Sequence, residues 1–294
     1  MLLRLVGRYN HMMKVLAPIA DTVWRGVCQL IEYFLYTCNQ FFASDLAEWD
    51  RSVYTTRLAA ALAATAAGLE GEGGPGAARL QPGVLEAGEP GLLAGLPQRL
   101  VAVESGVFLA EQLRGLLPYL ASSLGPEQVA GLDSFYAGTV AAAADLREPV
   151  YLAAVSASIN TEVLLAMMGR VAWDIREVST QHSAYVDHWL RELALFSGRL
   201  AKVATMVTVT PALGLLLWRQ AVRVATNCFV EGFAGARRCT NEGRALMQLD
   251  FRQFVIQAEK LSGLKPLPFQ ELVTVYVKAY YIQVRPSRPV FAYN

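Results

Sequence analysis

Three histidines and one carboxylate pair are the residues of this 294-residue sequence whose spacing could support chemistry. His182 and His188 stand six positions apart, so on one helix they would point to different faces. Zinc-binding histidine pairs are usually spaced by about three to five residues. Asp187 directly precedes His188, and adjacent helical positions also diverge. We therefore expect structural roles for the histidines, including the remote His11, in preference to metal binding or catalysis.

The carboxylates Asp174 and Glu177 lie three positions apart and could share one face of a helix. Arg170 and Arg176 are close to them, so ion pairs are the simpler interpretation. The sequence contains no HExxH, GxSxG or P-loop lysine motif. It therefore predicts no enzymatic activity, no catalytic or metal-binding residue and no cofactor.

Basic residues gather in the last quarter of the sequence, with acidic residues interspersed among them. The basic members are Arg237, Arg238, Arg244, Arg252, Lys260 and Lys265. The acidic members are Glu231, Glu242, Asp250 and Glu259. One interpretation is a solvated helix face with intrahelical ion pairs. The alternative is a docking surface for an acidic partner. Nucleic-acid binding is disfavoured because no aromatic platform is interleaved with the basic residues.

Composition excludes several broad classes of protein. Hydrophobic residues make up 54% and charged residues 17% of the sequence, which excludes general disorder. The net charge of +1 is too small for a long-range electrostatic attraction to nucleic acid or to an anionic bilayer. The four cysteines are far apart and are expected to be buried or half-buried thiols. We expect no signal peptide, because charged residues interrupt the apolar run at the N-terminus after three residues. We expect no transmembrane helix, because Pro211 interrupts the longest uncharged run, residues 203–218.

Hydrophobic periodicity is helical almost throughout and predicts an all-α fold of about nine or ten helices. The predicted helices cover residues 16–42, 45–67, 100–118, 126–146, 149–158, 162–170, 183–206, 211–229, 242–261 and 268–280. In the first helix the predicted buried stripe comprises Leu16, Ala20, Val23, Val27, Leu30, Phe34 and Phe41. In the helix over 100–118 it comprises Val103, Val107, Ala110, Leu113 and Leu117, and in the helix over 183–206 it comprises Tyr185, Trp189, Leu193, Phe196 and Leu200. Thr240 or Asn241 is the predicted cap of the helix over 242–261. Crowded aromatic residues at 33–42 and 276–281 indicate core packing, with docking of a helix in a groove as the alternative.

The predicted domain organisation has four parts. Residues 1–67 form an N-terminal helical pair, and residues 68–97 form a flexible Gly/Pro-rich linker. Residues 98–285 form a helical domain, and residues 286–294 form an irregular tail that follows Pro286. The linker contains a formal GxGxxG at Gly71, Gly73 and Gly76, but no strand precedes it, so we predict no nucleotide site there.

Several blocks of the sequence resemble the C-terminal region of the syndetin family. The most specific is VEGFAGARRCTNEGRALMQLDF (230–251), and TNEGRALMQLDFRQFVIQAEKL (240–261) followed by LPFQELVTVYVKAYYI (267–282) also resembles that region closely. Further blocks agree in order: IEYFLYT (31–37), RLVAVESGVFLAEQ (99–112), FYAGTVAAAADLREPVY (135–151) and WDIREVSTQHSAYVDHWLREL (173–193).

This resemblance implies an elongated helical rod of the multisubunit-tether type, without enzymatic activity. It implies a subunit of the endosome-associated recycling protein (EARP) complex, which supports endocytic recycling to the plasma membrane. Implied partners are the other tether subunits, SNAREs and Rab-type small GTPases. The implied location is cytoplasmic, peripheral on recycling endosomes and the trans-Golgi network through those partners.

The resemblance makes residues 230–251 a candidate contact surface. Together with the basic residues, it gives these candidate partner-binding residues: Arg237, Arg238, Asn241, Arg244 and Arg252. The chain is expected to lack the family's N-terminal half and to diverge after Ile282. The alternative function is therefore a truncated helical scaffold that binds a partner or a membrane surface outside the complex.

Overall fold

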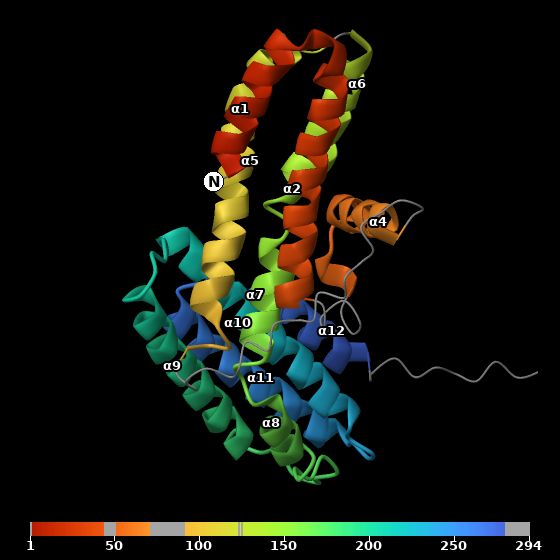
Figure 1. Cartoon of the computed structure of the whole chain (residues 1–294). Coiled ribbons are helices and arrows are strands. Elements are labelled where there is room, and N and C mark those ends of the chain that lie inside the picture. The colour runs from red at the N-terminus through yellow and green to blue at the C-terminus, as the bar shows by residue number, and fades with distance from the viewer. Residues whose placement is uncertain (1, 44–50, 71–91, 123, 125, 280–294) are drawn as a thin grey trace, which may run out of the picture. The chain divides into compact units, whose positions relative to one another are not determined.

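The computed structural model describes residues 2–43, 51–70, 92–122, 124 and 126–279. Within these residues the chain forms eleven α-helices and no strand, which confirms the predicted all-α class (Figure 1). The chain divides into two compact units. Unit 1 comprises residues 1–158 and 199–209, and unit 2 comprises residues 159–198 and 210–294. Most of the predicted linker and the whole predicted tail lie outside the described residues.

Unit 1 is built around two long helices, α2 (Ala20–Ala43) and α5 (Leu96–Ala121). The other helices of this unit are α1 (Leu2–Val15), α4 (Thr56–Glu70), α6 (Pro126–Phe135) and α7 (Arg147–Ser156). Short 3₁₀ turns cover Ala17–Ile19 and Arg51–Val53, and a π-helical turn covers Tyr136–Val140. Helix α2 contacts α1, α4, α5 and α7, so it is central to the unit.

The core of unit 1 lies between the facing stripes of α2 and α5. On α5, Val103, Val107, Ala110 and Leu113 are buried as predicted, whereas the predicted Leu117 is only half-buried. On α2 the buried stripe is rotated from the predicted one. Its apolar members are Ala20, Trp24, Val27, Ile31, Leu35, Cys38 and Ala43. The predicted Leu16 is exposed and Phe34 is only half-buried, because α2 is apolar around much of its circumference and periodicity alone could not select the face.

Several helix boundaries in unit 1 differ from the sequence-based expectation. Within the described part of the helix expected over residues 45–67, a 3₁₀ turn covers Arg51–Val53 and α4 begins only at Thr56. Helix α1 precedes the first predicted helix and buries Val6 and Met13, seven positions apart. Helix α5 continues through Pro118 to Ala121. The helix expected over residues 126–146 is divided, because α6 ends at Phe135 and the π-helical turn follows. In that turn the hydroxyl of Tyr136 donates a 2.6 Å hydrogen bond to the carbonyl of Leu113.

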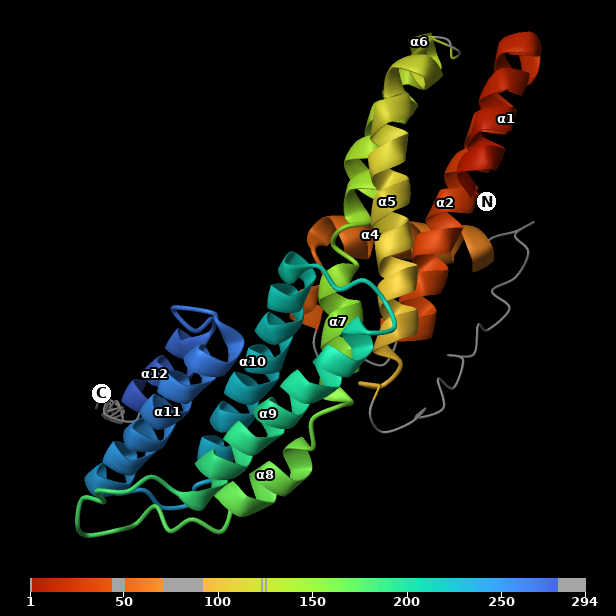
Figure 2. The same cartoon turned by 90° about the vertical axis from the view of Figure 1, so that its left-hand side faces the viewer.

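Unit 2 contains α8 (Thr161–Met168), α10 (Pro211–Ala234), α11 (Asn241–Ser262) and α12 (Gln270–Ala279). It also holds the portion of α9 (Ala184–Ala204) that precedes Arg199. Helix α10 contacts α8, α11 and α12, and Figure 2 shows α10, α11 and α12 side by side. Asn160 caps α8 and Thr210 caps α10 through their side chains, and Pro211 opens α10.

The core of unit 2 is rich in aromatic side chains. The rings of Trp189, Phe229 and Phe254 lie together, with centroids of Phe229 and Phe254 at 4.8 Å. Tyr185 and Phe233 extend this group from α9 and α10, and both are buried. Edge-to-face and offset contacts of this kind stabilise a core beyond the burial of apolar area alone. The group fixes α9, α10 and α11 against one another and so positions the start of α11.

Candidate partner-binding site

The segment between α8 and α9 is tied to the first turn of α11 by Thr240. The Thr240 hydroxyl accepts a hydrogen bond from the amide of Gly243 at 3.1 Å, which caps the helix as predicted. The same hydroxyl donates to the carbonyl of Ile175 at 2.7 Å. The amide of Thr240 donates to the carbonyl of Trp173 at 3.0 Å. One residue therefore caps α11 and holds the preceding segment 169–183 in place.

Gly243 allows this close approach of the two backbones. A Cβ atom placed on Gly243 would lie 1.8 Å from the carbonyl oxygen of Trp173, and that oxygen belongs to the main chain. Such a contact is far below any real van der Waals separation, so the segment 169–183 would have to move. The glycine at this position is therefore required by the packing of the segment on α11.

A second anchor of the same segment is the carboxylate of Asp250, which has no exposed surface. Asp250 accepts hydrogen bonds from the amide of Ser183 at 2.7 Å and from the hydroxyl of Tyr185 at 2.8 Å. Burial raises the pKa of Asp250 above its ordinary value of 3.8, and these hydrogen bonds offset only part of that effect. Asp250 thus faces the core and provides no counter-charge to the basic surface.

The structure brings three of the five predicted partner-binding residues onto one face of α11. Asn241, Arg244 and Arg252 are separated by three and eight positions, which places them within about a quarter of the helix circumference. The Nη2 atom of Arg244 donates to Oδ1 of Asn241 at 2.6 Å. Arg244 is half-buried, whereas Arg252 is exposed. Arg237 and Arg238 are exposed in the connection that precedes α11.

Arg252 also lines a groove between α11 and α12 with a volume of about 320 Å³. The side chains of Phe251, Val255, Val273 and Val277 contribute apolar surface to this groove. Among the described residues that line it, Arg252 on α11 and Lys278 on α12 are charged and none is a carboxylate. The groove therefore offers an apolar surface with positively charged residues, which suits an apolar segment that carries carboxylates.

Sequence reasoning identified Arg252 but missed the rest of this groove. The signal lay in Ile256 of α11, an exposed apolar residue that lines the groove. Periodicity accounts for one buried stripe per helix and gives no reason for apolar residues outside that stripe. Large apolar side chains that remain outside a predicted stripe are the feature that could have indicated a surface groove.

Two of the four acidic residues near the basic run have other roles. Asp250 is buried as described, and Oε1 of Glu259 accepts a hydrogen bond from the amide of Leu267 at 3.1 Å. These two carboxylates therefore accept hydrogen bonds from groups outside the basic run.

The carboxylates Asp174 and Glu177 do not share a helix face, because segment 169–183 is not helical. Its conformation is set by the contacts to Thr240 and Asp250 described above. His182 lies in this segment before α9 begins, and its Nε2 lies 3.0 Å from Oδ1 of Asp187. Asp187 therefore pairs with His182 and not with the adjacent His188. Among the described residues no group of three or more metal-binding side chains is found.

No single helix in the described part of the chain has both the length and the apolar character needed to cross a membrane. The bent pair α7 and α8 meets the length and composition criteria only when the two helices are taken together.

The family model described as "Syndetin, C-terminal" matches residues 93–287, which include Thr240, Gly243 and all of α11 and α12. The chain belongs to the syndetin family. Syndetin of Rattus norvegicus is 37% identical over 300 residues, which cover 95% of this chain and 31% of the rat protein. Syndetin of Gallus gallus is 38% identical over 299 residues, with the same coverage. The chain thus spans about a third of the length of these syndetins, and no solved structure matches it.

Proposed function

We propose that this chain acts as a non-enzymatic subunit of an EARP-like tethering complex that supports endocytic recycling to the plasma membrane. The observation that carries this proposal is its similarity to syndetin over 95% of its length. The all-α fold supports it, since packed amphipathic helices give rigid bodies with extended surfaces for protein contacts.

The proposed mechanism is bridging through protein–protein contacts. The surface that we assign to a partner comprises Arg237, Arg238, Asn241, Arg244 and Arg252, together with the α11–α12 groove. An apolar segment of the partner would enter the groove, and its carboxylates would meet Arg252 and Lys278 at low dielectric. Contacts of this kind set both the affinity and the orientation of a complex.

The proposed partners are the other subunits of the tethering complex, with SNAREs and Rab-type small GTPases as further partners. We propose a cytoplasmic location, peripheral on recycling endosomes and the trans-Golgi network through these proteins. The alternative function is a helical scaffold that acts outside the complex.

The location of the tagged chain in cells tests this proposal. We expect the chain to co-localise with a recycling-endosome marker and to become diffuse when another tether subunit is depleted. The double variant Arg252→Glu, Lys278→Glu should reduce endosomal recruitment, because it reverses both charges of the groove. Arg191→Glu is the matched control, since Arg191 is also an exposed arginine of unit 2 and does not line the groove.

Two results would count against the proposal. A diffuse distribution in unperturbed cells would favour a scaffold outside the complex. Endosomal recruitment that persists after depletion of the other subunits would indicate a different route to the membrane.

A further inference from the structure

Helix α5 carries an exposed row of uncharged residues on the side opposite its buried stripe. The row comprises Val101, Ser105, Phe108, Gln112, Gly115 and Tyr119. Its steps alternate between four and three residues, which is the spacing of a coiled-coil seam. Val101, Phe108 and Tyr119 are 57%, 55% and 59% exposed. The row extends about 27 Å along the helix at 1.5 Å per residue.

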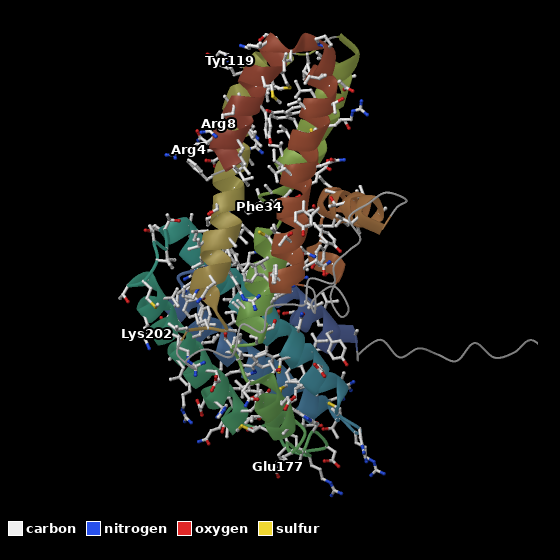
Figure 3. All side chains as sticks on the ribbon, in the orientation of Figure 1. Arg4, Arg8, Phe34, Tyr119, Glu177 and Lys202 are labelled. Atoms are coloured by element: carbon white, nitrogen blue, oxygen red, sulfur yellow. The ribbon has the colours of Figure 1, made fainter. Side chains whose placement is uncertain are left out.

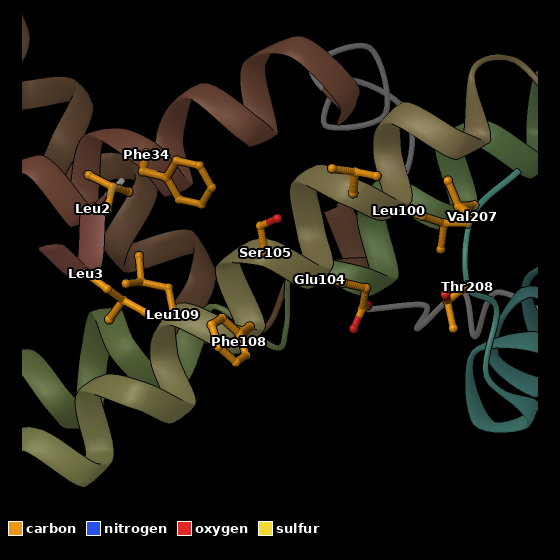
Figure 4. Close-up of a pocket in the computed structure, with 11 residues that line it drawn as sticks. Leu2, Leu3, Phe34, Leu100, Glu104, Ser105, Phe108, Leu109, Val207 and Thr208 are labelled. Atoms are coloured by element: carbon orange, nitrogen blue, oxygen red, sulfur yellow. The ribbon is translucent and has the colours of Figure 1, made fainter.

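An apolar groove with a volume of about 660 Å³ lies beside the first half of this row (Figure 4). Val101, Ser105 and Phe108 contribute to it from α5, and Leu2 and Leu3 contribute from the start of α1. Glu104 is the one carboxylate among the described residues that line it. That carboxylate is already engaged, because Arg147 donates to it at 2.8 Å and Tyr151 at 2.5 Å. The groove therefore presents apolar surface without an available negative charge.

Helix α1, which lies beside this row, carries only positive charges. Helix α1 contains Arg4, Arg8 and Lys14 and no acidic residue. The Lys14 ammonium lies 6.0 Å from the ring centroid of Tyr119, so it borders the exposed row. Figure 3 shows Arg4, Arg8 and Tyr119 projecting on the same side of unit 1. Positive charges of α1 thus border one side of an uncharged row that carries three large apolar side chains.

We propose that this face of unit 1 is a docking site for an amphipathic helix of a partner protein whose apolar side is flanked by carboxylates. The partner's apolar side would lie along Val101, Phe108 and Tyr119. Its carboxylates would face Arg4, Arg8 and Lys14 of α1. The inference concerns unit 1 alone and does not depend on the α11–α12 groove of unit 2.

The composition of the row favours a helix over a lipid surface as the occupant. A face that inserts into a membrane is built from large apolar residues, whereas Ser105, Gln112 and Gly115 hold three of the six positions of this row. The row also places Ser105 and Gly115 between the large side chains, and small residues let a second helix approach closely. A second copy of this chain is disfavoured as the occupant, because it would place the cations of one α1 near those of the other.

Binding of designed peptides to the purified full chain tests the proposal. The probe is a fluorescent helical peptide of about 20 residues with leucines at the seam positions and glutamates on both flanks. A second peptide carries lysine in place of every glutamate. We expect saturable binding of the glutamate peptide, measured by fluorescence anisotropy, and at least about tenfold weaker binding of the lysine peptide. Raising the salt concentration should weaken the first interaction.

Two variants and two matched controls localise the binding. Phe108→Asp should weaken binding of the glutamate peptide by at least about tenfold, because it places a charge in the centre of the seam. The double variant Arg4→Glu, Arg8→Glu should weaken binding of the same peptide several-fold, mainly at low salt. Val178→Asp and Arg191→Glu alter residues of the same kinds on exposed parts of unit 2 and should leave binding unchanged. Circular dichroism establishes that each variant is folded.

Each of the following results would overturn the proposal. The first is that neither peptide binds saturably. The second is that both peptides bind equally well. The third is binding of the glutamate peptide that survives Phe108→Asp. The fourth is that the chain binds neither peptide but floats with phosphatidylserine vesicles, and that Phe108→Asp abolishes the flotation. That result would assign the face to a membrane. The fifth is a dimer in light scattering that Phe108→Asp dissociates, which would assign it to a second copy.

Discussion

The hydroxyl of Tyr185 donates a 2.8 Å hydrogen bond to Oδ2 of Asp250, whose carboxylate has no exposed surface. Tyr185 is in the first turn of α9 and Asp250 is in the middle of α11, so the contact joins two helices of unit 2. The amide of Ser183 donates to the other carboxylate oxygen at 2.7 Å. A buried charge with two donors is tolerated in the folded state, but its desolvation still costs free energy.

This contact predicts how stability depends on pH. The pKa of Asp250 is raised in the folded state above its ordinary value of 3.8, mainly by burial. As the pH rises past that value, the unfolded chain releases a proton that the folded chain still holds, so Asp250 lowers the free energy of unfolding. Asp250→Asn removes this effect and can still hydrogen-bond with Ser183 and Tyr185. Its stability relative to the wild type should therefore increase between about pH 4 and the raised pKa.

Urea unfolding over a pH series measures this difference. Parallel curves for the wild type and Asp250→Asn would contradict the assignment of a raised pKa to Asp250. Tyr185→Phe leaves one carboxylate oxygen without its donor and should cost about 1–3 kcal/mol at neutral pH. Tyr33→Phe is the control, because Tyr33 is an exposed tyrosine and its loss of a hydroxyl should change stability by less than about 0.5 kcal/mol.

Glu104 of unit 1 should show the opposite pH dependence. Partial burial alone would raise the pKa of Glu104, but hydrogen bonds from Arg147 and Tyr151 outweigh it and hold this pKa below its ordinary value of 4.5. The stabilisation from Glu104 is therefore present above pH 4.5 and is lost as the pH falls through the lowered pKa. Glu104→Gln should cost about 1–3 kcal/mol at pH 7, and this cost should shrink in acid. A cost that is constant with pH would contradict the account.

The packing of segment 169–183 on α11 is tested by Gly243→Ala. The added Cβ would lie 1.8 Å from a main-chain oxygen, so we expect a loss of more than about 2 kcal/mol in the free energy of unfolding. Gly214→Ala in α10 is the matched control, because nothing lies within 4 Å of its Cβ position. That control should be neutral or stabilising by up to about 1 kcal/mol. Equal stability of the two variants would show that the close approach is not maintained.

The four cysteines are free thiols, and their reactivity should follow their burial. Burial raises the pKa of Cys38 to about 11 and that of Cys228 to about 12, so little thiolate is present at pH 8. Cys239 is half-buried. Mass spectrometry after brief alkylation of the native protein should find Cys239 modified before Cys38 and Cys228. Early modification of Cys38 or Cys228 would show that the cores open readily.

The strongly amphipathic helices were predictable from sequence. All five residues of the predicted stripe on α9 are buried, namely Tyr185, Trp189, Leu193, Phe196 and Leu200. Helix α2 was predictable as a helix but not in its orientation, because apolar residues lie on most of its circumference. Burial of Trp24 and Ile31 in place of Leu16 is decided by packing against α5 and α7.

The candidate site was only partly predictable. The basic residues and the cap at Thr240 follow from sequence, since a threonine before an apolar-periodic run is a known helix start. The extended course of segment 169–183 depends on contacts from Thr240 and Asp250, which are more than sixty positions distant. Charge patterns likewise gave no sign that Asp250 is turned into the core. Long-range hydrogen bonds of this kind leave no periodic signal.

Affinity purification of the tagged chain, followed by quantitative mass spectrometry, tests the central claim most directly. Full-length syndetin is purified in parallel as the positive control. The account predicts that the other subunits of the tethering complex are enriched with this chain as they are with the control. Enrichment of those subunits with full-length syndetin and their absence from the purified chain would contradict a role for this chain as a tethering-complex subunit.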